Sequence, residues 1–300
     1  MEKLYLAVDQ EHFNVDVFLP ADIRPERKAA PGIVMVIGGG GKDLLTGEPR
    51  GKYAAAYHDM AVHFSDAGFW VFLPSRRGDP SRTRASLHLT APSFRDRLCE
   101  TAQDENPNEG KHTHLKHVAE LKILLQNLTR YEIRGLDLSR LGILGKSAGG
   151  GVALRLVSEL SDRFASVALW GSALRTSQWF RGPKSDEFFR DVLDNRRVAY
   201  DRAAFLAEMC DAIDFVGDVT APMLAACAAP DPYAPLVPET DRWSSPEEQL
   251  QLLKYATNCR QARSTVVKGA EHTMYRELAA WRQCANTLSS WFAETLEARI

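Results

Sequence analysis

Hydrophobic and polar residues follow two patterns along the chain, and together these patterns predict alternating strands and helices. From Lys3 to Pro20 apolar and polar residues alternate, as in an antiparallel hairpin. Later stretches are apolar at nearly every position, which is typical of strands buried on both faces of a parallel sheet. We expect such strands at 33–37, 68–74, 140–145, 164–170, 221–229 and 264–269.

Between these stretches apolar residues recur every three or four positions, which predicts amphipathic helices. We expect the helices at 53–67, 114–128, 151–160, 246–259 and from residue 275 onward. Parallel neighbours need a crossover connection and a helix provides it, so the alternation predicts an α/β fold with a doubly wound, mostly parallel sheet. Residues 1–300 are expected to form one domain, with residues 172–220 inserted between two strands as a small cap.

Composition narrows the class of protein. The 300 residues are 45% hydrophobic and 25% charged, which is typical of a globular protein with a sizeable core. The net charge of −2 provides no basic excess to attract a phosphate backbone, so no nucleic acid is expected as a partner. Five scattered cysteines without a CxxC pair favour reduced thiols.

Location follows from the same composition. The N-terminus has no apolar core of signal-peptide length, which favours a cytoplasmic protein. No run of 18 apolar residues occurs, so no membrane span is expected. The sequence does not decide the oligomeric state, and a homodimer is one candidate.

One short stretch combines a buried strand, a serine among glycines and a helix. It reads LGILGKSAGGGVAL and contains the pattern G-x-S-x-G from Gly145 to Gly149, with Ser147 at its centre. In a parallel α/β sheet this turn lies at the carboxyl end of a strand, where ligands bind. A serine held there on a strained turn exposes its hydroxyl as a nucleophile. The alternative is a plain strand-to-helix turn that happens to carry a serine.

A serine nucleophile needs a general base and an acid that orients the base, and in this fold both follow the serine. Of the eight histidines only His272 lies beyond Ser147, in the loop after the last predicted strand. Asp231 follows the strand 221–229 in a proline-flanked turn, where an aspartate is also favoured for turn formation alone. Further candidates for the acid are Glu239, Asp241 and Glu271.

Two backbone N–H groups are expected to stabilise the oxyanion. One belongs to Ala148, directly after the nucleophile. The second belongs to Gly40, or next to Gly39, in the four-glycine segment after the strand 33–37. The rival interpretation of this segment is a phosphate-binding loop, but GGGGKD places Asp43 where that motif requires Ser or Thr.

The motifs GGGGKD, SRRG, GKSAG, AAPDPYAP and GAEHTMY, in this order, resemble the α/β-hydrolase superfamily. The resemblance begins near residue 30 and is closest to the dienelactone hydrolase-like and bacterial serine carboxylesterase branches. It implies about eight strands, helices on both faces, no cofactor, and hydrolysis of an ester or related acyl bond. Two positions depart from the pattern: Gly38 stands where many members have a histidine, and Ser147 where dienelactone hydrolase has a cysteine.

The expected reaction is cleavage of a small-molecule carboxylic ester, either an acyl ester or a lactone, through an acyl-enzyme on Ser147. Two alternatives stay open, a thioesterase or peptidase-like acyl hydrolase with the same triad and a non-catalytic receptor of the same fold. A zinc site at His112, His114 and His117 is disfavoured because Lys116 replaces the usual aspartate. No metal is expected.

Substrate contacts are the least specific part of the sequence. Arg76 and Arg77, after the strand 68–74, are candidates to hold a substrate carboxylate, although solvated loop charges or internal ion pairs are the favoured interpretation. Trp179 in the predicted cap is a candidate for an acyl pocket or for packing of the cap. Tyr233 lies close to Asp231 in sequence and is a further candidate.

Overall fold

A computed structural model describes residues 2–8, 11–21, 29–37, 51–74, 113–130, 133–172, 175, 211–229, 246–268, 270 and 278–297. Its strands form one eight-stranded sheet in the order β1-β2-β4-β3-β5-β6-β7-β8. The strands β1 and β2 form an antiparallel hairpin, and β2 runs antiparallel to β4. All the other neighbours are parallel, which confirms the predicted mostly parallel sheet of about eight strands.

Each of the six predicted apolar runs overlaps a strand, of which three begin before the predicted residue and three begin two residues after it. The strands are β1 (Glu2–Val8), β2 (Glu11–Phe18), β3 (Ala30–Ile37), β4 (Trp70–Pro74), β5 (Leu136–Lys146), β6 (Ser166–Trp170), β7 (Met223–Ala229) and β8 (Ala262–Lys268). The helices are α1 (Gly51–Asp66), α3 (Thr113–Arg130), α4 (Ala148–Glu159), α7 (Ala212–Phe215), α8 (Pro246–Tyr255) and α9 (Leu278–Glu297), with 3-10 turns η3 (Ser161–Arg163) and η5 (Val216–Asp218).

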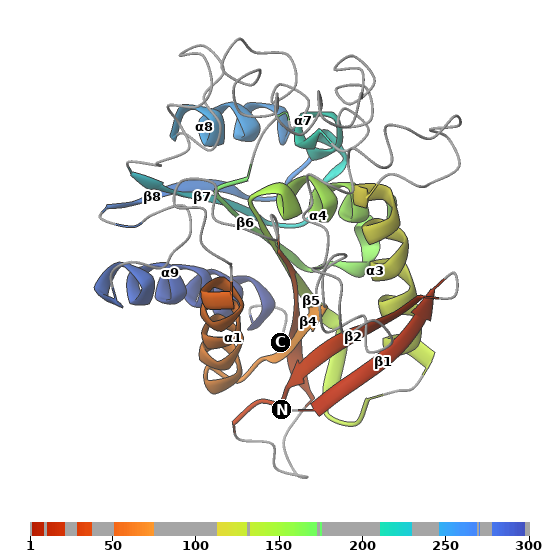
Figure 1. Cartoon of the computed structure of the whole chain (residues 1–300). Helices are drawn as coiled ribbons and strands as arrows, with labels where there is room; N and C mark the ends of the chain where they lie inside the picture. The colour runs from red at the N-terminus through yellow and green to blue at the C-terminus, as the bar shows by residue number, and fades with distance from the viewer. Residues whose placement is uncertain are drawn as a thin grey trace, which may run out of the picture.

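Helices cover both faces of the sheet, so each central strand is buried on two sides (Figure 1). The helices α1 and α9 lie on one face, and α3, α4 and α8 lie on the other. In β3, Met35 and Ile37 belong to the core under α1 and α9, whereas Val34 and Val36 belong to the core under α3 and α4. This alternation explains why the sequence of β3 is apolar without interruption.

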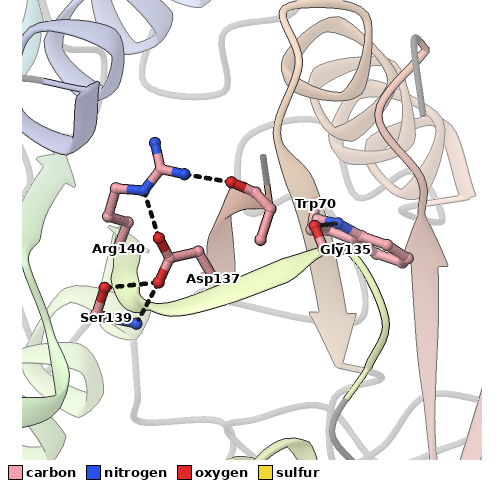
Figure 2. Close-up of polar contacts among 6 residues, drawn as sticks. Trp70, Gly135, Asp137, Ser139 and Arg140 are labelled. Carbon is pink, nitrogen blue, oxygen red and sulfur yellow. Dashed lines mark hydrogen bonds and ion pairs between the residues drawn. The ribbon is translucent and has the colours of Figure 1, made fainter. Parts of the chain in front are cut away.

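The strand β5 begins before its apolar run, and polar contacts hold this extension (Figure 2). The Nε of Arg140 lies 2.7 Å from Oδ2 of Asp137, and the guanidinium also donates to the carbonyl of Ala29. Oδ1 of Asp137 accepts from the backbone N–H of Ser139 at 2.9 Å. Polar residues of this kind give no hydrophobic pattern, so the prediction started at the apolar run.

Part of the predicted cap packs into the core. Residues 211–219 include α7 and η5, whose residues Ala212 and Val216 are fully buried in the core shared with α4. The guanidinium of Arg155 on α4 lies 4.8 Å from the ring centre of Phe215. Residues 176–210 of the predicted cap lie outside the described residues.

Within the described segments, no helix has both the length and the apolar character that a bilayer crossing requires.

Candidate active site

Ser147 lies between the end of β5 and the start of α4, at the carboxyl end of the parallel strands. The predicted sequence of strand, serine turn and helix is therefore observed. β3 and β6 flank β5 on its two sides, so this turn lies near the middle of the sheet. Parallel α/β sheets bind their ligands at this edge.

The backbone of Ser147 is strained. Its φ of 54° makes it the one non-glycine residue with positive φ in the described part of the chain. Such a conformation costs about 1–3 kcal/mol and persists only where the surroundings enforce it. Here the N–H of Ser147 donates to the carbonyl of Trp170 at 2.9 Å, and its carbonyl accepts from the N–H of Gly150 at 2.9 Å. The serine is thus held from β6 and from α4.

The glycines around Ser147 allow β5, α4 and the end of β6 to approach closely. A Cβ placed on Gly145 would lie 2.7 Å from the Cα of Gly150. A Cβ placed on Gly150 would lie 2.0 Å from Oγ of Ser172, which follows β6. Side chains at these two positions would force the helix away from the strand ends. Gly150, which weakens α4 as a helix, is therefore required by the close approach of α4 to the end of β6.

Helix α4 directs its amino end toward the serine. Ala148 is its first residue, and N–H groups in a first helical turn have no acceptor within their own helix. These groups also carry the positive end of the helix dipole. The N–H of Ala148 has the position along the chain that an oxyanion donor next to a nucleophile requires.

A buried glutamine, which the sequence did not single out, holds the turn after β6. Nε2 of Gln249 on α8 donates to the carbonyl of Ser172 at 3.2 Å, and Oγ of Ser172 donates to the carbonyl of Gly145 at 3.3 Å. Gln249 is 1% exposed, and its Oε1 has no hydrogen-bond partner among the described residues. It lies on the face of α8 that also buries Leu252, so the sequence pattern indicated only a core position.

A buried lysine lies directly before the nucleophile candidate. Lys146 is 4% exposed, and its Nζ lies 2.9 Å from Oη of Tyr57 on α1. The thiol of Cys284 on α9 lies within reach of the lysine's charge: burial raises the pKa of Cys284 to about 12, and the charge on Lys146 acts in the opposite direction. No sequence pattern relates Tyr57 to Lys146, because the two residues are 89 positions apart.

The other predicted catalytic residues lie outside the described residues, but the strands that precede them are described. Asp231 comes two positions after the end of β7, and His272 comes between β8 and α9. Gly39 and Gly40 follow β3 within three residues. Because β3, β5, β7 and β8 are parallel members of one sheet, their carboxyl ends lie at the same edge.

The predicted substrate contacts and the other acid candidates also lie outside the described residues. They are Arg76, Arg77, Trp179, Tyr233, Glu239, Asp241 and Glu271. Of the three histidines considered for zinc, His117 is buried in α3. The part of the chain that is described contains no group of three or more His, Cys, Asp or Glu residues placed to hold a metal.

A shallow groove lies away from Ser147, between β8 and α9. Its lining includes Arg263 and Glu294, which pair with each other through contacts of 2.8 Å and 2.7 Å. The indole of Trp291 lies beneath the same guanidinium, 5.6 Å from it. Arg263 and Glu294 thus neutralise each other, Arg282 is a further cation of the lining, and we place the candidate active site at the strained turn of Ser147 instead.

No protein-family model matches the sequence, and no curated protein matches it. Solved structures match over nearly the whole chain. Est1E from Butyrivibrio proteoclasticus gives a TM-score of 0.62 at 12% identity and covers 98% of this chain and 99% of its own. A dienelactone hydrolase from Anabaena variabilis gives a TM-score of 0.57 at 16% identity, with coverage of 98% and 97%.

A third structure is Thermogutta terrifontis esterase 2 phosphoramylated by tabun. It gives a TM-score of 0.59 at 15% identity and covers 98% of this chain and 94% of its own. These neighbours are esterases and a hydrolase, and identities this low show a shared fold. The order of the strands, the helices on both faces and this likeness together establish that the chain has the α/β-hydrolase fold.

Proposed function

We propose that the protein is a serine hydrolase that cleaves a carboxylic ester, either an acyl ester or a lactone, through an acyl-enzyme on Ser147. The observation that carries the proposal is the strained backbone of Ser147 at the carboxyl end of β5, where α4 begins. Strain of this kind is concentrated at functional sites, because it is otherwise a pure cost. The fold shared with esterases supports the same reaction class.

The first half of the proposed reaction forms the acyl-enzyme. His272, oriented by Asp231, accepts the proton of the Ser147 hydroxyl while Oγ attacks the ester carbonyl. The N–H of Ala148 and that of Gly40, or of Gly39 in its place, stabilise the oxyanion. The intermediate collapses when the bond to the leaving oxygen breaks, and His272 returns its proton to the alcohol.

The second half releases the acid. Water gives a proton to His272 and attacks the acyl carbonyl, and the same donors stabilise the second oxyanion. The bond to Oγ then breaks, and the proton returns from His272 to Ser147. No cofactor takes part in this scheme. Arg76 or Arg77 would pair with a substrate carboxylate, and Trp179 and Tyr233 would contact the acyl group.

The experiment that tests the proposal is labelling with a fluorophosphonate, which reacts with activated serines. Wild-type protein, Ser147→Ala and a control Ser158→Ala would be treated in parallel, and the modified peptide would be identified by mass spectrometry. Ser158 lies on α4, where its hydroxyl donates to the carbonyl of Arg155. The loss of this hydroxyl should therefore leave the turn at Ser147 intact.

We expect label on Ser147 in the wild-type and Ser158→Ala proteins and none in Ser147→Ala. A folded wild-type protein that takes up no label would contradict the proposal and would favour a non-catalytic receptor. After labelling succeeds, a panel of esters, thioesters and lactones distinguishes the ester hydrolase from a thioesterase on the same triad.

A further inference from the structure

The position of Lys146 in the sheet calls for an apolar residue. Its partners in register are Ile37 of β3 and Trp170 of β6, and both belong to the hydrophobic core under α1 and α9. Leu144, two positions earlier on β5, belongs to the same core. A lysine in this layer places a positive charge where water is excluded, which lowers the stability of the fold unless the charge is compensated.

A neutral phenol holds the amino group of Lys146. Oη of Tyr57 accepts a hydrogen bond from Nζ at 2.9 Å, and Nζ lies 5.1 Å from the centre of the Tyr57 ring. A phenol oxygen accepts a hydrogen bond from the ammonium but does not neutralise its positive charge. Among the described residues no carboxylate forms an ion pair with Lys146. Its positive charge is therefore fixed in place and available to act on its surroundings.

Lys146 directly precedes the proposed nucleophile in the chain, at the end of β5. An acyl-transfer intermediate on Ser147 carries a negative charge that its surroundings must stabilise, and a preorganised positive charge in a water-poor site does so effectively. The side chain of Lys146 also adds a third restraint on the turn. The N–H and the carbonyl of Ser147 hold it to β6 and α4, and the Lys146–Tyr57 contact holds it to α1.

We propose that Lys146, held by Tyr57 at the end of the strand that carries the nucleophile, is a positioning residue that supplies a positive charge for acyl transfer, an inference that rests on the proposed function. Two titratable groups meet it, the phenol of Tyr57 from α1 and the thiol of Cys284 from α9. Burial raises the pKa of Cys284 to about 12, so this thiol brings no negative charge to the site near neutral pH.

Three variants separate the charge from the packing. Lys146→Met removes the charge and keeps the length of the side chain, and Lys146→Arg keeps the charge. Tyr57→Phe keeps the ring and removes the acceptor. The readouts are the second-order rate constant for fluorophosphonate labelling of Ser147 between about pH 5 and pH 9, and the temperature of thermal unfolding.

We expect Lys146→Met to react roughly tenfold to a hundredfold more slowly than the wild type. The acidic limb of its pH profile, the range in which the labelling rate constant rises with pH, should move to higher pH. A general base without a neighbouring positive charge is protonated more easily. The unfolding temperature of Lys146→Met should be equal to or above that of the wild type, because a buried charge has been removed. Lys146→Arg should keep the acidic limb of the pH profile at the wild-type pH. Tyr57→Phe should lower the labelling rate constant without moving that limb.

The outcomes are distinct. A folded Lys146→Met protein with a rate constant within about twofold of the wild type and an unchanged limb would overturn the role of Lys146 and leave the proposed function intact. If Lys146→Met does not fold, Tyr57→Phe decides in the same way, and a rate constant equal to that of the wild type overturns the role. A wild-type protein that takes up no label overturns the proposed function, and this role with it.

Discussion

The backbone N–H of Ser147 donates a hydrogen bond of 2.9 Å to the carbonyl of Trp170, the last residue of β6. The bond continues the pairing of β5 with β6 one residue beyond the end of β5. The sheet thus holds the serine in place even though its φ has left the extended region. The strain of the turn is supported by strand pairing, which is among the strongest restraints available to a backbone.

The first prediction concerns this strain. Ser147→Gly should be more stable than Ser147→Ala by about 1 kcal/mol, because glycine adopts positive φ without a steric cost and alanine does not. Both variants remove the hydroxyl, so they should be equally inert toward a fluorophosphonate. Urea denaturation of the two proteins measures the difference, and equal stability would show that the backbone in solution is not held at positive φ.

The second prediction concerns the close approach of α4 to the end of β6. Gly150→Ala should destabilise the protein by about 1–3 kcal/mol, because its Cβ would lie 2.0 Å from Oγ and 2.4 Å from Cβ of Ser172. Ser172→Gly removes both atoms and leaves the nearest remaining atom, the Cα of residue 172, at 3.4 Å.

The double variant Gly150→Ala, Ser172→Gly should therefore recover most of the stability that Gly150→Ala loses. A double-mutant cycle from denaturation curves gives the coupling free energy between the two sites. Additive effects, with no recovery, would mean that the new methyl group is accommodated by movement of α4 rather than limited by Ser172.

The third prediction concerns pH and the far end of α4. Burial acts to raise the pKa of Glu159, but hydrogen bonds and charge from Lys122 and Arg155 outweigh it and lower the pKa below its usual 4.5. A carboxyl whose pKa is lower in the folded state stabilises the fold above its unfolded pKa and loses this contribution as pH falls.

The free energy of unfolding should therefore decrease as the pH falls from about 5 toward the lowered pKa of Glu159. In Glu159→Gln this part of the decrease should be smaller, because Gln does not titrate. Denaturation curves at several pH values for both proteins test the difference. Parallel pH profiles would show that the contacts of Glu159 with Lys122 and Arg155 do not stabilise the fold in solution.

Much of the fold was predictable because burial on both faces of the sheet leaves uninterrupted apolar runs. The first and last residues of the strands and helices were less predictable. β5 starts at Leu136, and its first residues are held both by the polar contacts of Asp137 and by the packing of Leu136 and Leu138 against the core. Helix α8 ends at Tyr255, before the predicted residue 259, although Ala256 and Cys259 continue the apolar pattern. Both still pack against the core from a turn, so burial continued where the helix did not.

The candidate site divides in the same way. The turn at Ser147 was predictable because strand, glycines and helix are contiguous in sequence. The contacts that surround it join distant positions: Lys146 with Tyr57 across 89 positions, and Gln249 with Ser172 across 77. A single sequence contains no pattern that relates such residues. Only the folded sheet brings them together.

The central place of β5 in the sheet has a consequence for how the protein loses its proposed site. Amides that are buried and hydrogen-bonded in central strands exchange with solvent mainly when the whole domain opens, whereas edges and loops open by local fluctuations. The N–H of Ser147 has both properties, since the residue is 6% exposed and its amide is bonded to Trp170. Its exchange rate should follow global unfolding, and the serine keeps its geometry for as long as the sheet itself survives.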